Sequence, residues 1–416
     1  MTATSWDIVV IGAGAAGLLA ASQAAERGRR TLLLEKNRKA GVKILMSGGT
    51  RCNITHATDN RGIVEAFGPP GKFLHSALAA LSVDETIALF ESEGVPTKTE
   101  ENGKIFPVSN KASDVLDALL RRLQRSGATL ALEEPLLDIQ RLASGFTLTT
   151  PRRCLNASRV ILTTGGKSYP GSGTTGDGYG IAARFGHTIV PPRPALVPIT
   201  VSIPWVLELR GITIPDVCLR VCAAEACLAS RRGSLLFAHF GLTGPVALDV
   251  SRVVSGHSRP ETLHLEIDLL PSLPEAALDE FLRTEAASAG GKQLAGILAG
   301  HLPRRLGDAL LCHAGMQPER KSAGLSKLER GQLVRAVKNL RLPVAGTLGF
   351  GKAEVTAGGV ALDEVDSRRM ESKRLPGLYI AGEVLDLDGP IGGYNFQAAF
   401  STGWLAGDMA ARFPGE

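Results

Sequence analysis

The sequence predicts an α/β fold in which a Rossmann-like domain is split by a long insertion. Residues 7–27 follow the order strand, glycine-rich turn, helix. Residues 160–166 and 377–383 each form an apolar strand pattern that ends in glycine. Because the first and last segments are expected to build one site, the stretch between Pro191 and Leu348 is interpreted as the insertion. The length of 416 residues, at roughly 100 to 200 per domain, predicts two or three domains.

Composition and charge exclude several classes of protein. Hydrophobic residues make up 44% of the chain, enough for a large core, whereas aromatic residues make up 5%, too few for a surface built on base stacking. The formal net charge of +5 does not by itself predict a nucleic-acid partner. Residues 303–341, however, hold nine Lys or Arg and three acids. This basic segment is either a solvated helical face or a surface that binds phosphates.

The cysteines and the apolar runs indicate a reduced setting away from membranes. The chain has six cysteines and no Cys-x-x-Cys pair, and Cys218, Cys222 and Cys227 have no histidine beside them in metal-like spacing, so no metal is expected. An apolar run starts at Ile8, but Asp7 and no basic residue precedes it, unlike a signal peptide. No run is long enough for a membrane span. A cytoplasmic protein without membrane contact is expected.

The opening turn matches a dinucleotide-binding pattern. We expect Gly12 to permit the turn, Gly14 to let the backbone approach a pyrophosphate, and Gly17 to let the helix pack on the strand. The helix that follows presents its N–H groups and the positive end of its dipole to the phosphates. Glu35 ends the second strand 18 residues after Gly17, where an acid accepts hydrogen bonds from an adenosine ribose.

The next stretch favours flavin over nicotinamide. Residues 41–53 are polar and rich in glycine, where a nicotinamide dehydrogenase would normally pass directly into its next helix. Ser47 and Asn53 are candidates to hydrogen-bond a cofactor, and Arg51 is a candidate to offset the charge of the pyrophosphate or of a reduced, anionic ring. Cys52 is either inert filler or a residue with a chemical role.

Two later segments are expected to return to the same nucleotide. The strand at 160–164 ends in two glycines, typical of backbone that lies against the adenine half of a dinucleotide. Glu383 follows another strand and is expected to bind the ribityl or ribose region. Residues 389–399 indicate a loop and a helix start, whose N-terminus would stabilise negative charge on a reduced flavin. The complete set of expected cofactor-binding residues is Gly12, Gly14, Ala15, Ala16, Gly17, Glu35, Lys36, Lys43, Ser47, Gly48, Gly49, Thr50, Arg51, Cys52, Asn53, Thr164, Gly165, Gly166, Gly382, Glu383, Gly392, Gly393, Tyr394 and Asn395.

Together these motifs resemble one family, the BaiN/RdsA-type flavoproteins, also known as aminoacetone-oxidase-family or YhiN-like FAD-binding enzymes. The combination of the Ser-Gly-Gly-x-Arg-Cys-Asn block at 47–53 with the Gly-Gly-Tyr-Asn-Phe-Gln block at 392–397 is specific, and the resemblance extends over nearly the whole chain. Two positions depart from the family pattern. Glycine is usual where Thr50 stands, and a basic residue is usual where Val42 stands. Thr50 therefore puts in doubt a positive φ at its position.

The resemblance implies FAD as the cofactor and a particular division into domains. A discontinuous FAD-binding domain would begin with residues 1–190. An inserted β-barrel-like domain would follow at 191–274, and a small helical domain at 275–342. Residues 343–416 would end the insertion and return to the FAD-binding domain.

The resemblance also implies a reductase of a C=C bond conjugated to a carbonyl. Its substrate would be uridine in large-subunit ribosomal RNA, to give dihydrouridine, or an oxidised bile acid. Hydride would leave flavin N5 for one carbon while a general acid protonates the neighbouring carbon, and Cys52, His239 and Tyr394 are the candidate catalytic residues. Because the chain lacks a second glycine motif for a nicotinamide, NAD(P)H is expected to dock transiently. Ribosomal RNA would bind through the basic segment.

Two other interpretations stay open at this point. The first is an oxidase that takes hydride from a small amine, such as an aminoketone, and passes electrons to oxygen. The second is a flavin-carrying binding or assembly protein without turnover. The sequence carries no signal for the oligomeric state or for a choice between NADH and NADPH.

Overall fold

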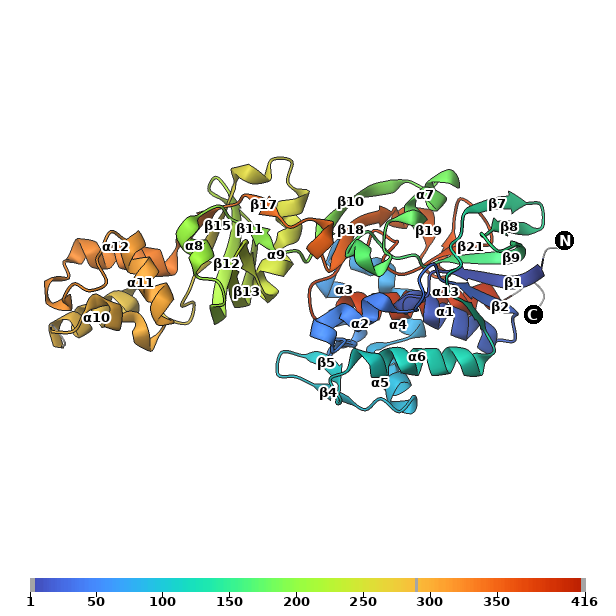
Figure 1. Cartoon of the computed structure of the whole chain (residues 1–416), viewed down its shortest axis with the longest axis horizontal. Helices are drawn as coiled ribbons and strands as arrows, with labels where there is room; N and C mark the ends of the chain where they lie inside the picture. Colours follow the sequence, from blue (N-terminus) through green and yellow to red (C-terminus); the bar gives the residue numbers. More distant parts are fainter. Residues whose placement is uncertain (1–3, 289–290, 413–416) are drawn as a thin grey trace. The chain divides into compact units, whose positions relative to one another are not determined.

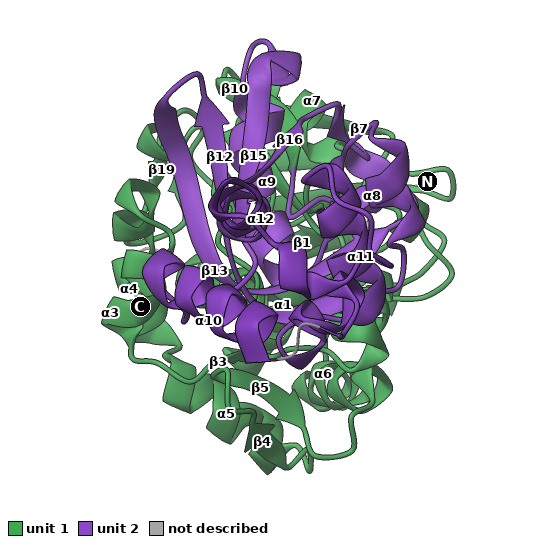
Figure 2. Ribbon diagram, turned by 90° about the vertical axis from the view of Figure 1, so that its left-hand side faces the viewer, with its two compact units in different colours: residues 1–194, 354–416 green, residues 195–353 purple. Residues whose placement is uncertain are grey.

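The chain forms two compact units, in a computed structural model that describes residues 4–288 and 291–412. Unit 1 comprises residues 1–194 and 354–416, and unit 2 comprises residues 195–353 (Figure 2). The predicted α/β fold, split by an insertion, is therefore confirmed. The finer division of the insertion into a barrel-like and a helical domain stays a prediction.

The main sheet of unit 1 is parallel at its centre and brings the ends of three strands to one edge (Figure 1). Its strands are β1 (Thr4–Ile11), β2 (Thr31–Leu34), β6 (Thr129–Ala131), β7 (Asp138–Leu142), β8 (Gly145–Thr149), β9 (Cys154–Leu162), β19 (Val365–Asp366), β20 (Glu371–Ser372) and β21 (Leu378–Ile380). The order is β19-β20-β21-β9-β1-β2-β6, and the β7–β8 hairpin joins β9. Ile11 lies opposite Leu34 and Leu162, and Leu162 lies opposite Ile380, all in parallel register. The segments that follow β1, β9 and β21 therefore meet at the carboxyl edge, where ligands bind in such sheets.

Two helices pack against each other through glycines beside this sheet. They are α1 (Ala15–Glu26) and α13 (Tyr394–Ala411). A Cβ added at Gly403 would lie 2.3 Å from the Ala16 carbonyl oxygen, and one at Gly407 would lie 2.3 Å from the Ala20 carbonyl oxygen. Side chains larger than hydrogen would force the helices apart. The first and last helices of unit 1 are thus held in direct backbone contact.

The remaining elements of unit 1 surround this frame. The helices are α2 (Val42–Met46), α3 (Asn60–Ala66), α4 (His75–Ala80), α5 (Val83–Ser92), α6 (Ala112–Ser126) and α7 (Asp177–Arg184). A small sheet joins β3 (Thr55–His56), β4 (Thr97–Thr99) and β5 (Lys104–Pro107), and β10 (Ile189–Ala195) pairs with β18 (Val355–Val360). Ser82 and Glu85 form a capping box at the start of α5, which satisfies backbone N–H groups there.

The sheet of unit 2 curls back on itself. Its strands are β11 (Ile199–Thr200), β12 (Thr213–Ala223), β13 (Ala226–Ala238), β14 (Gly241–Thr243), β15 (Leu263–Asp268), β16 (Leu340–Pro343) and β17 (Gly346–Thr347), in the order β16-β15-β12-β13-β14-β11-β17. Val344 donates its N–H to the carbonyl of Leu263, and Ala345 donates to that of Thr200. The chain therefore steps from one edge strand to the other within two residues. Among the described residues no ladder joins β16 to β17, so the curled sheet is not a closed barrel.

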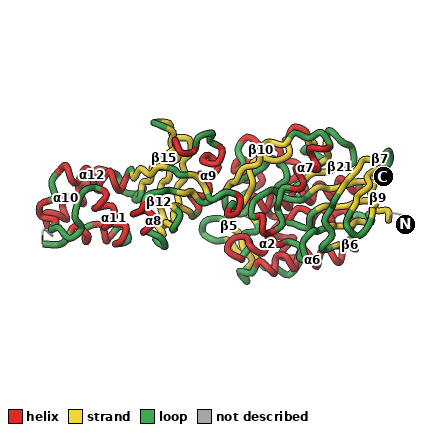
Figure 3. The backbone as a smooth tube through the Cα atoms, turned by 45° about the horizontal axis from the view of Figure 1, so that its top comes forward, coloured by secondary structure: helices red, strands yellow, loops and turns green. Residues whose placement is uncertain are grey.

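Helices of unit 2 share a core with its sheet. They are α8 (Pro204–Glu208), α9 (Pro245–Gly256), α10 (Glu275–Ser288), α11 (Arg304–His313) and α12 (Lys327–Lys338). Figure 3 shows α10, α11 and α12 gathered beyond the strands of the unit. Leu219 of β12, Leu282 of α10, Leu310 of α11 and Val337 of α12 are buried in one hydrophobic cluster. This burial stabilises the strands and the helices together.

Within the described part of the chain, no single helix is both long and apolar enough to cross a membrane. One bent pair, Pro69–Ala80 with Val83–Ser92, passes the same test on length and composition alone.

Candidate functional site

The turn between β1 and α1 has the shape that a diphosphate needs. Gly12 adopts a φ of +99°, and a Cβ added at Gly17 would lie 1.8 Å from the Gly12 carbonyl oxygen, so both positions require glycine. At Gly14, in contrast, an added Cβ would meet no described atom within 4 Å. No side chain in the described structure caps α1, whose first residues are Ala15 and Ala16. The open space at Gly14 and the uncapped helix end fit a bound diphosphate.

Glu35 is fixed at the end of β2 by backbone donors. The side chain is buried, and its two carboxylate oxygens accept N–H groups of Ala13 and Asn37, both at 2.9 Å. Each oxygen keeps a second lone pair, which is the acceptor that a ribose hydroxyl requires. Lys36 instead turns to Asp177 and Thr175, at 2.6 and 2.7 Å.

The segment after β2 combines a short helix with left-handed backbone. Gly48 and Gly49 have φ of 55° and 66°, and Thr50 and Cys52 follow with φ of 70° and 58°. Thr50 thus has the positive φ that the family's glycine would allow, although a threonine side chain makes this backbone conformation strained. Asn53 is buried, and none of the described residues donates a hydrogen bond to its Oδ1 atom. A buried acceptor without a donor is expected where a ligand completes the site.

Arg51 and Cys52 are already engaged by the protein. Arg51 pairs with Glu100 at 2.7 Å, and its guanidinium lies 3.9 Å from the centre of the Phe106 ring. Cys52 is fully buried, and burial raises the pKa of its thiol from 9.0 to about 12, against the opposing effect of a hydrogen bond with Ser47. At neutral pH Cys52 is therefore a protonated thiol without access to solvent. The expected roles of both residues toward the cofactor stay predictions.

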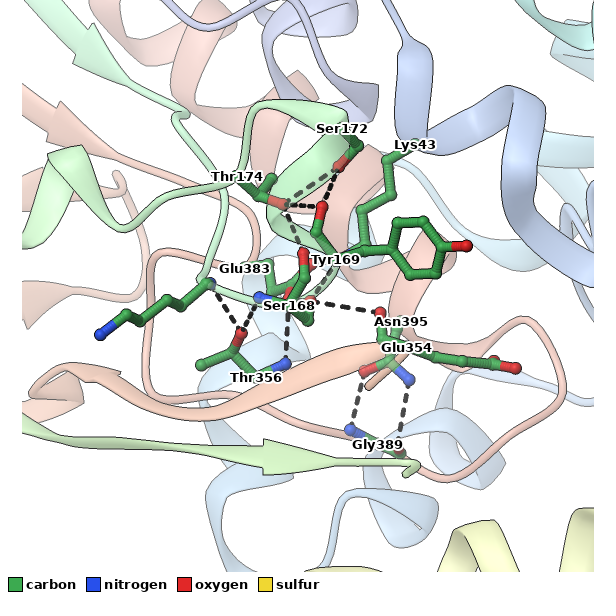
Figure 4. Close-up of polar contacts among 11 residues, drawn as sticks. Lys43, Ser168, Tyr169, Ser172, Thr174, Glu354, Thr356, Glu383, Gly389 and Asn395 are labelled. Carbon is green, nitrogen blue, oxygen red and sulfur yellow. Dashed lines mark hydrogen bonds and ion pairs between the residues drawn. The ribbon is translucent and has the colours of Figure 1, made fainter. Parts of the chain in front are cut away.

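Glu383 organises the polar groups behind this segment (Figure 4). Its carboxylate pairs with Lys43 and accepts hydrogen bonds from the Ser168 hydroxyl at 2.8 Å and the Thr356 N–H at 3.0 Å. Lys43 also donates to the Ser168 hydroxyl at 2.7 Å. Three distant segments, α2, the loop after β9 and the loop after β21, are therefore tied together at one point. The carboxylate oxygens of Glu383 therefore accept hydrogen bonds from the protein itself. The sequence analysis expected them to bind the ribityl or ribose region of the cofactor.

The loop after β9 supplies another unpaired acceptor. The Oγ1 atom of Thr164 is buried and has no hydrogen-bond partner in the described structure. Gly165 has a φ of 72°, and a Cβ added at Gly166 would lie 2.5 Å from Thr356 Oγ1. Gly382, after β21, has a φ of 78° and would meet Ala16 Cβ at 2.8 Å. Gly382 therefore lies so close to the start of α1, and Gly166 so close to β18, that larger residues do not fit.

The loop before α13 is held by close packing of its glycines and by the side-chain amide of Asn395. Gly393 has a φ of 95°, and an added Cβ would lie 2.4 Å from the Thr55 carbonyl oxygen. Asn395 accepts the Gly389 N–H at 2.8 Å and donates to the Gly389 carbonyl at 3.0 Å, so its amide braces the loop. Tyr394, the first residue of α13, is partly exposed at this end of the helix. Gly392 precedes it with a φ of 128°.

Two residues outside the predicted site set, His56 and Gln397, lie beside the loop before α13. His56 stacks on Tyr394 with ring centroids 4.6 Å apart, and its Nδ1 lies 3.0 Å from the Gly392 carbonyl oxygen. Burial lowers the pKa of His56, which favours the neutral ring. Gln397 is fully buried, accepts from the Thr55 hydroxyl at 2.6 Å and donates to Thr86 at 2.8 Å. Gln397 lies in the block at 392–397, so the sequence pointed to its segment. No sequence pattern pointed to His56, because its partner Tyr394 lies at the opposite end of the chain.

His239 and the basic segment belong to unit 2. His239 follows β13 and lines a cavity of about 330 Å³ together with Leu207, Glu208, Arg210 and Arg305. Part of the positive charge of the basic segment is offset, because five of its side chains are in ion pairs with acids, three of which lie outside the segment. These five are Arg304, Arg320, Arg330, Lys338 and Arg341.

The parallel sheet, the glycine turn before α1, the buried acid at the end of β2 and the uncapped helix are features of one class, the Rossmann-type FAD-binding oxidoreductases. The chain belongs to the family described as "HI0933-like protein Rossmann domain", which matches residues 6–409. This result confirms the resemblance on which the sequence-based expectation of a flavoprotein enzyme rested.

Two curated relatives and one solved structure illustrate the similarity. The chain is 35% identical over 410 residues to the ribosomal RNA dihydrouridine synthase of Escherichia coli (strain K12), with 98% of each protein covered. It is 31% identical over 410 residues to the 3-dehydro-bile acid delta(4,6)-reductase of Clostridium scindens, with 98% of this chain and 99% of that protein covered. The 3-ketosteroid-delta4-(5alpha)-dehydrogenase of Rhodococcus jostii RHA1 shares the fold, with a TM-score of 0.50, 17% identity, and coverage of 99% of this chain and 97% of that chain.

Proposed function

We propose that this protein reduces a C=C bond conjugated to a carbonyl, and that its substrate is uridine in large-subunit ribosomal RNA. The observation that carries this proposal is the full-length similarity to two proteins named for the same type of chemistry. Formation of dihydrouridine and reduction of a delta(4,6) unsaturated 3-ketone both add hydrogen across a C=C bond that a carbonyl polarises. The higher identity to the ribosomal RNA enzyme favours uridine over a steroid.

The residues of unit 1 suit FAD. Gly14 and the N-terminus of α1 would hold the diphosphate, and Glu35 would hold the adenosine ribose. Asn53 Oδ1 and Thr164 Oγ1 are buried acceptors that donors of the cofactor would satisfy. When bound, FAD supplies the hydride. We further propose NAD(P)H as the transient electron donor.

Of the three candidate acids, we assign the proton to Tyr394. Its ring is held against His56, and it directly follows Gly392 and Gly393, two glycines with positive φ. Its phenol would donate a proton to the substrate carbon next to the one that receives hydride. Cys52 has no exposed surface, and the role expected of His239 stays a prediction.

Ribosomal RNA from a deletion strain tests the substrate. Mass spectrometry of the digested RNA should show the loss of one dihydrouridine, which the wild-type gene restores. The Tyr394→Phe variant keeps the ring stack and should bind FAD while restoring at least tenfold less product per unit time. Ribosomal RNA that is unchanged after deletion would defeat the assignment to uridine.

The reductant and the steroid alternative are tested with the purified protein. Anaerobic titration with NADH and with NADPH should bleach the flavin absorbance. Bleaching by neither would remove NAD(P)H from the proposal. Turnover of an unsaturated 3-ketosteroid, without any action on ribosomal RNA, would favour the chemistry of the Clostridium scindens relative instead.

A further inference from the structure

Unit 2 carries four potential metal ligands side by side on one face of its sheet. Cys222 of β12 lies opposite Cys227 of β13 and opposite His264 of β15. Glu266 follows His264 by two residues, so it projects from the same face of β15. We call Cys222, Cys227, His264 and Glu266 the thiol–imidazole cluster. The strand neighbour Leu265 is fully buried on the opposite, core face.

The ligand atoms of this cluster are close together. The Sγ of Cys222, a ring nitrogen of His264 and a carboxylate oxygen of Glu266 all lie within 4.8 Å of one another. Cys227 is within hydrogen-bonding reach of Cys222. In a tetrahedral zinc site with bonds of 2.0–2.3 Å, ligand atoms are roughly 3.5 Å apart. A side-chain movement of about 1 Å would therefore bring the atoms of Cys222, His264 and Glu266 to this spacing, and Cys227, whose thiol now donates to the Ala229 carbonyl, would turn to complete the set.

The four groups are donors of electron pairs, which a bound cation would accept. Cys222 is buried, and its thiol lies beside the carboxylate of Glu266 and the ring of His264. The Nε2 atom of His264 is buried, lies 3.5 Å from Glu266 Oε1 and makes no hydrogen bond to any described residue. An imidazole nitrogen is a common metal ligand.

We propose that the thiol–imidazole cluster binds one Zn²⁺ ion through Cys222 Sγ, Cys227 Sγ, His264 Nε2 and a carboxylate oxygen of Glu266. Sulfur, imidazole and carboxylate are the ligands that Zn²⁺ takes in proteins, and four protein ligands make a closed, structural site. Both thiols lose their protons to solvent as the two Zn–S bonds form. The ion would join the β12–β13 hairpin to β15 on the face opposite the core.

Two arginines support the proposed site from outside. Arg341 lies 2.7 Å from Glu266 Oε1, and Arg220 lies 3.5 Å from Glu266 Oε2. Two thiolates, one carboxylate and Zn²⁺ carry a net charge of −1, which these cations offset. A hydrogen bond to a ligating carboxylate also orients it.

Metal content of the full-length flavoprotein tests the proposal. After treatment with a chelator, addition of Zn²⁺ and dialysis, the wild-type protein should hold one Zn²⁺ per chain. Cys222→Ser and His264→Ala should bind it at least tenfold more weakly. Cys218→Ser is the matched control, because Cys218 lies on the same strand and contacts Ser230 instead, and it should bind Zn²⁺ as the wild type does. With Co²⁺ as the probe, the wild type and Cys218→Ser should show a thiolate-to-metal absorption band.

The proposal stays testable even if Cys222→Ser or His264→Ala fails to fold. Cys227 is exposed, so Cys227→Ser tests the same ligand set without disturbing the core, and the flavin content of each variant reports whether unit 1 is intact. A wild-type protein that retains no Zn²⁺ would overturn the proposal. Equal Zn²⁺ binding by the wild type and all ligand variants would also overturn it, because the ion would then be adventitious.

Discussion

Two glycines of the first turn have different roles, one in folding and the other in ligand binding. Gly17 lies against the Gly12 carbonyl, so it is required by packing alone. Gly14 has a φ of −85°, which any residue adopts, and open space before it. Packing therefore does not account for glycine at position 14, whereas close approach of a ligand does.

Substitution by alanine at these two positions should give opposite patterns. Gly14→Ala should change the free energy of unfolding of the FAD-free protein by less than about 0.5 kcal/mol. It should weaken FAD binding at least tenfold, about 1.4 kcal/mol. Gly17→Ala should lose about 1–3 kcal/mol of stability through overpacking, and with it the flavin. Urea unfolding and flavin titration measure both. Normal FAD affinity in Gly14→Ala would contradict the position given to the diphosphate.

Cys52 should be unreactive in the folded protein. Because burial raises the pKa of its thiol to about 12, the thiolate that attacks alkylating reagents is scarce at pH 8. Iodoacetamide should modify the exposed Cys154 and Cys312 first, as peptide mass spectrometry would show. In urea all cysteines should react. Modification of Cys52 as fast as that of Cys154 in the native protein would contradict its burial.

At the scale of elements, the contact of α1 with α13 joins the two ends of unit 1. Gly403→Ala should cost about 1–3 kcal/mol, because its Cβ would lie 2.3 Å from the Ala16 carbonyl oxygen. Gly180→Ala is the matched control in helix α7, where a Cβ meets no described atom within 4 Å, and it should gain about 1 kcal/mol from helix propensity. Chemical denaturation of both variants measures the difference. Equal effects would show that the helices do not require close contact.

The buried carboxylate of Glu364 joins the residue before β10 to the segment after β20 and should make unit 1 sensitive to acid. Arg374 lowers the pKa of Glu364 from 4.5 to about 2, and Thr188 adds hydrogen bonds against the effect of burial. A depressed pKa contributes stability above the unfolded value, and this is lost as pH falls through the folded value. Glu364→Gln should therefore flatten the loss of unfolding free energy between about pH 5 and pH 2. The exposed control Glu101→Gln should keep the wild-type dependence.

At the scale of the molecule, the order of motifs along the chain predicted the fold because parallel strands bring their carboxyl ends together. The opening turn, the return at Gly165 and Gly166 and the loop after β21 were located in this way. Contacts that depend on register between distant segments were not predictable. The stack of His56 on Tyr394 and the meeting of Cys222 with His264 are examples, since neither pair has a local signal.

Some expected roles changed because neighbours could not be read from the sequence. Asn395 braces its own loop through Gly389, and Glu383 is held by Lys43, Ser168 and Thr356. The backbone at Thr50 is left-handed despite its side chain, because the turn of Gly48 and Gly49 continues through it.

A crystal structure of the protein grown with FAD would test the proposed site most directly. The diphosphate should lie before Gly14 at the start of α1, with a ribose hydroxyl on Glu35 and a donor of the cofactor on Asn53 Oδ1. The ring should lie between residues 47–53 and residues 389–394. A colourless protein that takes up no added FAD, or a cofactor bound away from Gly14 and Glu35, would contradict the assignment.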